Sequence, residues 1–392
     1  MDKMKKPLKI LMGENLVWNC GVKVGSHHYG EFFLKNQNRI FWLALPWNIF
    51  HLLVKGKKEE RIKHWKWNRP IRIKEDFYCL SPFTLLPYRN NFLVRGMIFA
   101  DLALKFTIPN IYKILKIYGF NEVDILWITD PRMFYLTTKI SYKALIYRCV
   151  DDFALFKDVS PSVSKLENIL VKKSDIVFAT SFLLLEKLSK IRKDVIYLPN
   201  GVDNDFFANS YHPNLLPKEF QEKNKPIAVY VGTVGDWFDV ELLSRAAREL
   251  PEVKFIIVGP IRRNIDKLNG IPNVISYGPM PYESIPTILK VADVGIIPFK
   301  INRLTDAVSP IKLFEYFSCG LPVVAPKVKE IMHLNSPAEL YEGVDEFIVG
   351  LKRALSYGKE KPGFEDFARK NSWKSRFEII KKAYNFLSDG QL

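Results

Sequence analysis

The sequence predicts an α/β protein made of two doubly wound (Rossmann-like) parallel-sheet domains facing a cleft. Short β-branched and aromatic runs recur every 20–40 residues, with helical patterns between them. These runs are apolar throughout rather than alternating, which is typical of parallel strands covered by helices on both faces. Ligands of such sheets bind at the carboxyl ends of the strands, and a cleft between two such domains is the expected site.

The strand-like runs occur in both halves of the chain. In the first half we expect strands at Leu8–Asn15, Arg39–Pro46, Val123–Pro131, Lys143–Asp152, Asp175–Ser181 and Val195–Val202. In the second half we expect strands at Ile227–Trp237, Val253–Pro260, Asn273–Met280, Ala292–Phe299 and Leu321–Pro326. Between the halves, the polar stretch Asp203–Pro226 has no clear period and predicts a linker. The predicted domains are therefore residues 1–205 and 206–372.

Composition excludes several classes of protein. The 392 residues are 48% hydrophobic and 26% charged, as in globular proteins and unlike disordered chains. The four cysteines are widely spaced without a C-x-x-C motif, so neither a disulfide scaffold nor a cysteine-rich zinc site is expected. The longest apolar run, Ile40–Val54, is interrupted by Pro46, Asn48 and His51, and the start lacks the apolar core of a signal peptide. We therefore expect a cytoplasmic protein.

The net charge of +16 is concentrated in one half of the chain. Residues 1–200 hold 33 Lys and Arg against 18 Asp and Glu, whereas residues 201–392 hold 25 against 24. A basic half indicates a polyanionic partner such as nucleic acid, an anionic lipid surface or a phosphorylated acceptor. The alternative is a solvated basic surface without a partner.

Two segments of the first half combine basic and aromatic residues. Asn91–Phe120 is rich in aromatic residues and carries Arg95, Lys105, Lys113 and Lys116 against a single acid, Asp101. Lys55–Arg72 is also basic and aromatic. Amphipathic segments of this kind can lie in a membrane interface. The alternative is an ordinary core-facing helix with a basic loop, and the charge of this half favours membrane contact.

A helix start in the second half is the first candidate site. Ser309 is a good N-cap, Pro310 suits the first helical position and Gly320 suits the end of the helix. Ile311 and Lys312 then lie in the first turn. A lysine there opposes the helix dipole unless an anion faces it.

The same helix start has the parts of a phosphate site. Free backbone N–H groups, the dipole and the Lys312 ammonium would together hold a phosphate group. Glu315 lies one turn further along the same face, and a carboxylate there suits the two hydroxyls of a ribose. The alternative is a surface ion pair between Lys312 and Glu315, with no ligand.

Two loops after strands of the second half are further candidates. Val231–Trp237 contains Gly232, Thr233 and Gly235, and glycines after a strand let the backbone approach a phosphate. Ser276–Met280 is a Gly-Pro loop that could hold a flat base against backbone groups. Either loop could also be a plain turn.

The first half supplies carboxylates and histidines. Asp151 and Asp152 end a predicted strand, and adjacent carboxylates can raise one pKa into the range of a general base. Asp130 ends another predicted strand, and His27 and His28 follow Ser26 at a predicted helix start. The alternatives are helix caps, a solvated acid and a capping pair of histidines.

No set of residues has convincing metal spacing. The sequence Asp203–Asp205 mimics a metal-binding D-x-D motif, but it follows Asn200-Gly201 in a turn. We therefore expect no metal site.

Several motifs resemble those of GT-B-fold glycosyltransferases. They are Tyr197–Phe207 (YLPNGVDNDFF), Ala292–Phe299, Glu315–Pro326 and Asn371–Ile380. The Ser-Pro-x-Lys-x-x-Glu helix start and the Tyr-x-x-x-Asp-Asp strand end are most similar to teichuronic-acid-type and xanthan glucuronosyltransferase-like enzymes. The large retaining family 4 carries a Glu where this chain has Ala307, and an Arg and a Lys where it has Thr233, Asp236 and Asp239.

The resemblance implies a hexosyl or glycosyltransferase of the 2.4 class that uses an NDP-sugar, with UDP favoured. It implies donor binding by the second domain, with Lys312 at the diphosphate, Glu315 at the ribose and the loop of Met280 at the base. It implies inversion, with Asp151 or Asp152 as the base, and no essential metal or other cofactor. The last helix, about 373–392, would cross back to the first domain.

The implied partners follow from the same resemblance. The acceptor would be a lipid-linked saccharide for cell-surface polysaccharide or glycolipid synthesis, met by His27, His28 and Asp130. The enzyme would be peripheral on the inner face of the cell membrane. Alternatives are a sugar-nucleotide 2-epimerase of the same fold, which needs no acceptor, and a basic nucleic-acid-binding protein, which predicts steeply salt-dependent binding. No recognised nucleic-acid module supports the latter.

Overall fold

The computed structural model describes residues 6–20, 23–48, 66, 68–86, 96–156, 159–221, 224–358 and 363–388. The chain divides into two compact units. Unit 1 comprises Met1–Leu198 and Ile379–Leu392, and unit 2 comprises Pro199–Glu378. The sequence placed the division a few residues later, between residues 205 and 206.

Unit 1 contains a sheet in the order β11-β10-β9-β8-β1-β2-β5-β4. Its strands are β1 (Lys9–Glu14), β2 (Arg39–Ala44), β4 (Ile71–Lys74), β5 (Phe77–Leu80), β8 (Glu122–Ile128), β9 (Ser141–Cys149), β10 (Ile176–Ala179) and β11 (Ile196–Tyr197). Neighbouring strands are parallel, except that β4 is antiparallel to β5. The central strands are almost wholly buried, as the continuous apolar runs predict.

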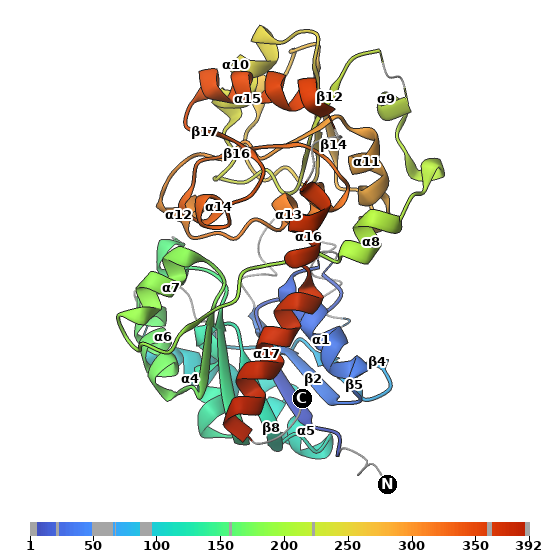
Figure 1. The fold of residues 1–392 in the computed structure, drawn as a ribbon. Coiled ribbons are helices and arrows are strands. Elements are labelled where there is room, and N and C mark those ends of the chain that lie inside the picture. Colours follow the sequence, from blue (N-terminus) through green and yellow to red (C-terminus); the bar gives the residue numbers. More distant parts are fainter. Residues whose placement is uncertain are drawn as a thin grey trace. The chain divides into compact units, whose positions relative to one another are not determined.

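Helices and a small second sheet complete unit 1 (Figure 1). The small sheet pairs β3 (Trp47–Asn48), β6 (Phe83–Thr84) and β7 (Thr107–Ile108). The helices are α1 (Gly25–Lys35), α4 (Met97–Lys105), α5 (Ile111–Ile117), η1 (Pro131–Thr138), η2 (Phe153–Leu155), α6 (Ser162–Lys173) and α7 (Phe182–Ser189). One apolar core joins α4, α5 and α6 to the strands.

Unit 2 is a parallel sheet in the order β14-β13-β12-β15-β16-β17. Its strands are β12 (Ile227–Val231), β13 (Lys254–Val258), β14 (Val274–Gly278), β15 (Val294–Ile296), β16 (Val323–Pro326) and β17 (Glu339–Tyr341). The helices are α8 (Asn204–Asn209), η3 (Pro213–Leu215), α9 (Lys218–Gln221), α10 (Val240–Glu249), η4 (Asp266–Leu268), η5 (Tyr282–Ser284), α11 (Ile285–Val291), α12 (Arg303–Asp306), α13 (Ile311–Ser318), α14 (Lys329–His333), α15 (Val344–Tyr357) and α16 (Phe364–Lys370).

The amphipathic helices of unit 2 bury one face against this sheet. In α15 the buried positions include Phe347, Leu351 and Ala354, which recur at the helical spacing of three and four residues. The sequence therefore predicted the α/β class correctly, and each of the eleven expected strands overlaps an observed one. The final helix, α17 (Trp373–Ser388), begins in unit 2 and ends in unit 1.

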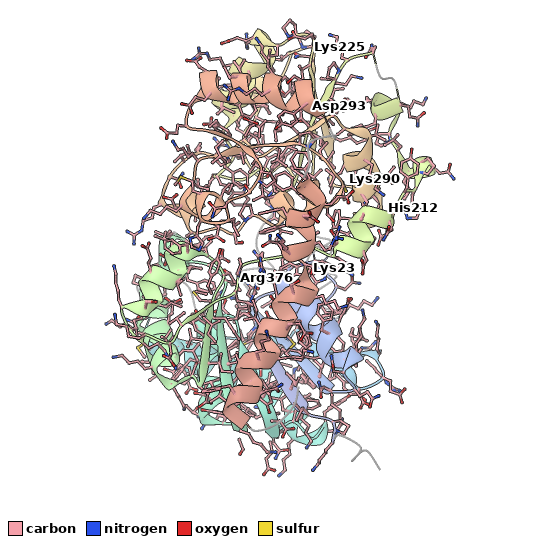
Figure 2. The ribbon with its side chains drawn as sticks, in the orientation of Figure 1. Lys23, His212, Lys225, Lys290, Asp293 and Arg376 are labelled. Carbon is pink, nitrogen blue, oxygen red and sulfur yellow. The ribbon has the colours of Figure 1, made fainter. Side chains whose placement is uncertain are left out.

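The expected linker Asp203–Pro226 is wrong as a description of the observed chain, because its described residues fold against unit 2. Lys290 of α11 donates hydrogen bonds to the carbonyl oxygens of Ala208 (2.6 Å) and Ser210 (2.9 Å). The backbone N–H of His212 donates to Thr287 Oγ1 at 2.7 Å. Figure 2 labels Lys290 and His212 on these neighbouring elements. Polarity suggested a linker here, but side chains of α11 hydrogen-bond to the backbone of this stretch and hold it against unit 2.

No helix in the described part of the chain is both long and apolar enough to cross a bilayer.

Candidate functional site

Two glycine turns meet at the carboxyl ends of β12 and β13 in unit 2. Gly232 and Gly259 have φ of +149° and +140°, which side chains rarely adopt. A Cβ on Gly259 would lie 2.2 Å from the carbonyl oxygen of Gly232. Glycine is therefore required where these two loops touch, and backbone is brought to the ligand-binding edge of the sheet.

Helix α13 starts beside these turns, one residue later than the sequence suggested. Pro310, rather than Ser309, is the N-cap residue. Buried Ser309 instead accepts a hydrogen bond from the Asn200 backbone N–H at 3.2 Å, and its carbonyl accepts from Asn200 Nδ2 at 2.8 Å. The helix N-terminus thus has no side-chain cap. Ile311 and Lys312 lie in the first turn, as predicted, and Gly320 has the left-handed conformation of a helix end (φ +68°).

Lys312 lies against the Gly232 turn. A Cβ on Gly232 would be 3.2 Å from Lys312 Cε. The ammonium lies 4.9 Å from the ring centre of Phe299 and 5.5 Å from that of Tyr230. Aromatic faces attract a cation, but they do not supply the hydrogen-bond acceptors that an ammonium needs.

Burial shifts the pKa of Lys312 downward and that of Glu315 upward, and each group's charge partly offsets the other's shift. No ion pair joins the two side chains in the described part of the chain. The expected alternative, a surface ion pair, therefore does not describe them. Lys312 therefore places a half-buried ammonium on aromatic rings, beside two glycine turns and an uncapped helix start. This arrangement is suited to bind an anion.

The remaining candidates of unit 2 lie on neighbouring loops. The Thr233 carbonyl accepts a hydrogen bond from Tyr230 Oη at 2.8 Å. Gly235 lies under the Trp237 ring, where a Cβ would be 2.6 Å from the ring atoms. Met280 packs, partly buried, against the core of unit 2 after β14. The structure thus places Lys312 directly against Gly232.

In unit 1, the two adjacent aspartates have different surroundings. Asp152 is buried, caps η2 through the Ala154 N–H and accepts a hydrogen bond from Lys187 Nζ at 2.8 Å. The same ammonium donates to Glu167 at 2.6 Å. Burial works to lower the pKa of Lys187, but the Glu167 and Asp152 carboxylates outweigh it and raise the pKa. Asp152 is therefore held in a structural ion pair.

Asp151 has no such partner among the described residues, and it is partly exposed. Burial of its carboxyl raises the pKa to about 7, although nearby Arg148 lowers it and Asp130 raises it further. A partly exposed carboxyl with that pKa is suited to accept a proton near neutral pH.

A second carboxyl with a raised pKa ends β1. Glu14 is buried, and its Oε2 accepts a hydrogen bond from Thr129 Oγ1 at 2.6 Å. Its Oε1 has no hydrogen-bond partner among the described residues. Burial raises the pKa of Glu14 to about 7, while Thr129, Ser26 and Arg148 lower it. Since β1, β8 and β9 are neighbours, Glu14, Asp130 and Asp151 lie at one edge of the sheet.

Arg148 is the cation of this edge. Its side chain is buried at the end of β9, and the guanidinium lies 5.2 Å from the ring centre of Tyr29. It acts electrostatically on both Glu14 and Asp151. Asp130, in contrast, forms two hydrogen bonds with the Arg132 guanidinium (2.9 and 2.6 Å) and caps η1 through the Arg132 N–H.

The two histidines of α1 are neutral and buried. His27 Nδ1 accepts from the Val24 N–H at 3.3 Å, and Nε2 bonds to the Trp18 carbonyl at 3.0 Å. Burial lowers the pKa of His27 to about 4 and that of His28 to about 3. The capping alternative considered from the sequence thus describes His27, whose ring nitrogens both serve the loop before α1.

Sequence reasoning missed Glu14, Arg148, Glu167 and Lys187. Each lies in a run that also predicts a strand or a helix, so its side chain gave no separate indication. A charged residue at the end of an otherwise apolar strand, as with Glu14 and Arg148, is the pattern that could have identified two of them. Among the described residues, no group of three or more His, Cys, Asp or Glu side chains is arranged to hold a metal ion.

Known proteins with similar sequences indicate the family of this chain. Residues 213–359 match the family model for glycosyl transferases group 1. The chain is also 28% identical over 283 residues to TuaH of Bacillus subtilis (strain 168), named as a teichuronic acid biosynthesis glycosyltransferase. That match covers 66% of this chain and 70% of TuaH. The chain is a glycosyltransferase with a group 1 domain.

Solved structures show that this glycosyltransferase has the GT-B fold. Sucrose-phosphate synthase from Thermosynechococcus elongatus matches with a TM-score of 0.69 at 12% identity, covering 97% of this chain and 99% of that one. Anabaena HepE, solved in complex with UDP, matches with a TM-score of 0.65 at 14% identity, covering 96% and 100%. The group 1 match falls within unit 2, which contains the Gly232 turn and Lys312.

Proposed function

We propose that this glycosyltransferase moves a sugar from a UDP-sugar to a hydroxyl of a lipid-linked or saccharide acceptor, with inversion at the anomeric carbon. The product would belong to a cell-surface polysaccharide or glycolipid. The observation that carries the proposal is Lys312, a half-buried ammonium set on two aromatic rings beside the Gly232 turn and an uncapped helix start. This arrangement is suited to a diphosphate.

Donor binding follows from the same loops. Lys312 and the free N–H groups at the start of α13 hold the diphosphate, with backbone of Gly232–Gly235 beside it. Glu315 accepts hydrogen bonds from the ribose hydroxyls, and the Met280 loop contacts the base. The structure of HepE with UDP and the group 1 match support a nucleotide here, and UDP is our choice among nucleotides.

Asp151 is the base in this mechanism. Its carboxylate takes the proton of the acceptor hydroxyl while that oxygen attacks the anomeric carbon. The bond between the anomeric carbon and the diphosphate oxygen breaks, and UDP leaves with the bonding electron pair. Asp152 does not serve because Lys187 and the Ala154 N–H hold its carboxylate.

The leaving diphosphate is stabilised by this chain's own groups. Lys312 and the α13 N–H groups face the charge that develops on the oxygen of the leaving group. We therefore propose a reaction without an essential metal ion, in which EDTA leaves the rate unchanged.

The first experiment incubates the full chain with radiolabelled UDP-sugars and a lipid extract of bacterial membranes. Transfer predicts label in a saccharide or lipid product, with the anomeric configuration opposite to that of the donor. An epimerase would instead convert the UDP-sugar to its 2-epimer without any extract. A product of retained configuration would show that Asp151 does not act as the base. If no donor gave a product and no nucleotide bound, the proposed function would be wrong.

A further inference from the structure

Five of the exposed large apolar side chains of unit 1 lie between residues 85 and 117, whereas Phe156, Ile169, Phe386 and Leu387 lie elsewhere in the unit. Leu85, Ile98, Phe106, Ile108 and Ile117 are each 48–75% exposed. The segment contains α4, β7 and α5, which follow β6 and precede β8 in the sequence. Figure 1 shows α4 and α5 outside the strands of the main sheet. Scattered single apolar residues are normal on a surface, but a group of five needs an explanation.

Local structure places these side chains on one surface. In the antiparallel pair of β6 and β7, Thr84 lies opposite Thr107. Leu85 follows Thr84 and Phe106 precedes Thr107, so these two residues are neighbours across the pair. Along β7, Thr107 is buried and Ile108 is exposed, as alternation along a strand requires.

The two helices continue this surface. Ile98 and Lys105 are seven residues apart and share the exposed face of α4. Lys113, Lys116 and Ile117 share the exposed face of α5, whose buried side carries Ile111 and Leu115. Helix α5 packs against α4, and the Thr107 hydroxyl accepts the first free N–H of α5, from Ile111, at 3.1 Å. The turn between the helices is therefore fixed, and its apolar side chains stay outward.

The charge of this surface has one sign. Lys105, Lys113 and Lys116 are exposed, and none has an ion pair in the part of the chain that the structure describes. The Lys105 ammonium lies 5.7 Å from the ring centre of Phe106. Asp101 is the single acid among residues 96–120. Apolar side chains interleaved with lysines match a bilayer of anionic lipids, whose headgroups attract lysine while aliphatic groups enter the acyl boundary.

We propose that the α4–α5 surface, formed by Leu85, Ile98, Lys105, Phe106, Ile108, Lys113, Lys116 and Ile117, docks on an anionic phospholipid bilayer. The biological role of this docking rests on the proposed function, since a lipid-linked acceptor requires the enzyme to work at a membrane. Each lysine adds about fivefold to the partition coefficient, and each inserted Ile or Phe adds about tenfold or more.

Vesicle flotation of the full chain tests the surface. Vesicles of phosphatidylcholine containing about one-third phosphatidylglycerol supply the anionic bilayer, and pure phosphatidylcholine is the neutral control. The wild type is expected to float with the anionic vesicles only. The triple variant Ile98→Ser, Phe106→Ser, Ile117→Ser is expected to remain unbound, and Lys105→Gln, Lys113→Gln, Lys116→Gln to bind about a hundredfold more weakly.

A matched control uses apolar residues that are similarly exposed elsewhere. Ile169 of α6 and Val349 of α15 are 41% and 48% exposed, and Ile169→Ser, Val349→Ser is expected to float like the wild type. Unchanged flotation of the apolar triple variant, or no flotation of the wild type, overturns the proposal. The proposal is also overturned if the wild type is a dimer and the apolar triple variant is a monomer while the control variant stays dimeric, because a second copy of the chain then covers the surface. UDP-induced thermal stabilisation, measured in every variant, reports separately on the proposed function.

Discussion

At the residue scale, the decisive contrast lies between Asp151 and Asp152. The two are adjacent in sequence and share the end of β9, but one ammonium distinguishes them. Lys187 and Glu167 hold Asp152 in a buried network, whereas Asp151 is partly exposed with a pKa raised to about 7 by burial. The surroundings assign a structural role to one carboxyl and proton transfer to the other.

Replacement of each aspartate by asparagine should separate these roles. Asp151→Asn is expected to lower kcat by about a thousandfold or more with little change in stability, because it removes the base. Asp152→Asn is expected to destabilise unit 1 by about 2–4 kcal/mol, because the Lys187 ammonium then keeps only Glu167 of its two buried carboxylate partners. Initial rates and urea unfolding measure both effects. Equal kcat losses in two equally stable variants would contradict the assignment.

Glu14 predicts a pH-dependent contribution to stability. Its folded pKa of about 7 lies above the ordinary value of 4.5, so the folded state binds the proton more tightly than the unfolded chain. The contribution of protonated Glu14 to the free energy of unfolding is therefore complete below about pH 4.5 and is lost as the pH rises through 7.

Glu14→Gln keeps the acceptor for Thr129 and removes the ionisation. The variant is expected to match the wild type in stability at pH 5 and to exceed it by about 1–3 kcal/mol at pH 8. Urea midpoints at the two pH values measure this difference, and Glu330→Gln, at another buried glutamate, is the control. A constant difference across this range would show that Glu14 is ionised in the folded protein.

At the element scale, α13 and the two glycine turns form one unit of structure. The turns need positive φ, and Gly259 leaves room only for a hydrogen atom beside the Gly232 carbonyl. The helix contributes its first turn and Lys312, while Tyr316 from its next turn accepts a hydrogen bond from the Val231 N–H at 2.8 Å. That bond fixes the helix against the end of β12, so Lys312 is positioned before any ligand binds.

Lys312→Met tests this element. Methionine keeps the packing on Phe299 and Tyr230 but lacks the charge, so the unliganded variant should be as stable as the wild type or more so. A nucleotide at about a hundred times its Kd should raise the wild-type Tm by about 5–10 °C. A thermal-shift panel of UDP, GDP, ADP and CDP is expected to give that rise with UDP and less than about 1 °C in the variant. If UDP raised the Tm of the variant as much as that of the wild type, the diphosphate would bind somewhere other than the start of α13.

At the scale of the whole molecule, each unit has its own apolar core. One core is built on β12 to β16 and the other on β1, β2, β8, β9 and β10. Helix α17 is shared between the units, because it begins in unit 2 and ends in unit 1. Separate cores allow the units to unfold in separate steps.

Calorimetry should therefore resolve two unfolding transitions. UDP is expected to raise the midpoint of one transition only, since its proposed site lies within unit 2. Asp152→Asn is expected to lower the other. If UDP and Asp152→Asn acted on the same transition, either the donor site would lie in unit 1 or the two cores would unfold together.

The amino-acid sequence was sufficient to predict the features that depend on neighbours along the chain. Apolar runs fixed the α/β class and eleven strands, because full burial of a strand requires apolar residues at every position. Pro310 and Gly320 bounded α13 to within a residue and placed Lys312 in its first turn. The strands β3, β4, β5, β6, β7 and β17 were not predicted, since each is only two to four residues long and several contain polar or charged residues, which leaves no continuous apolar run to detect.

Which polar residues face one another depends on the folded chain and could not be predicted from the sequence. Lys187 lies 35 residues from Asp152, and Thr129 lies 115 residues from Glu14. The same holds for the α4–α5 surface, where Leu85 and Phe106 become neighbours through strand pairing. A pKa and a hydrogen bond depend on such distant contacts, and the parallel strands that create them are joined through long crossover segments. The sequence supplied the candidate residues, and the packing of the sheet determined which of them remained available for chemistry.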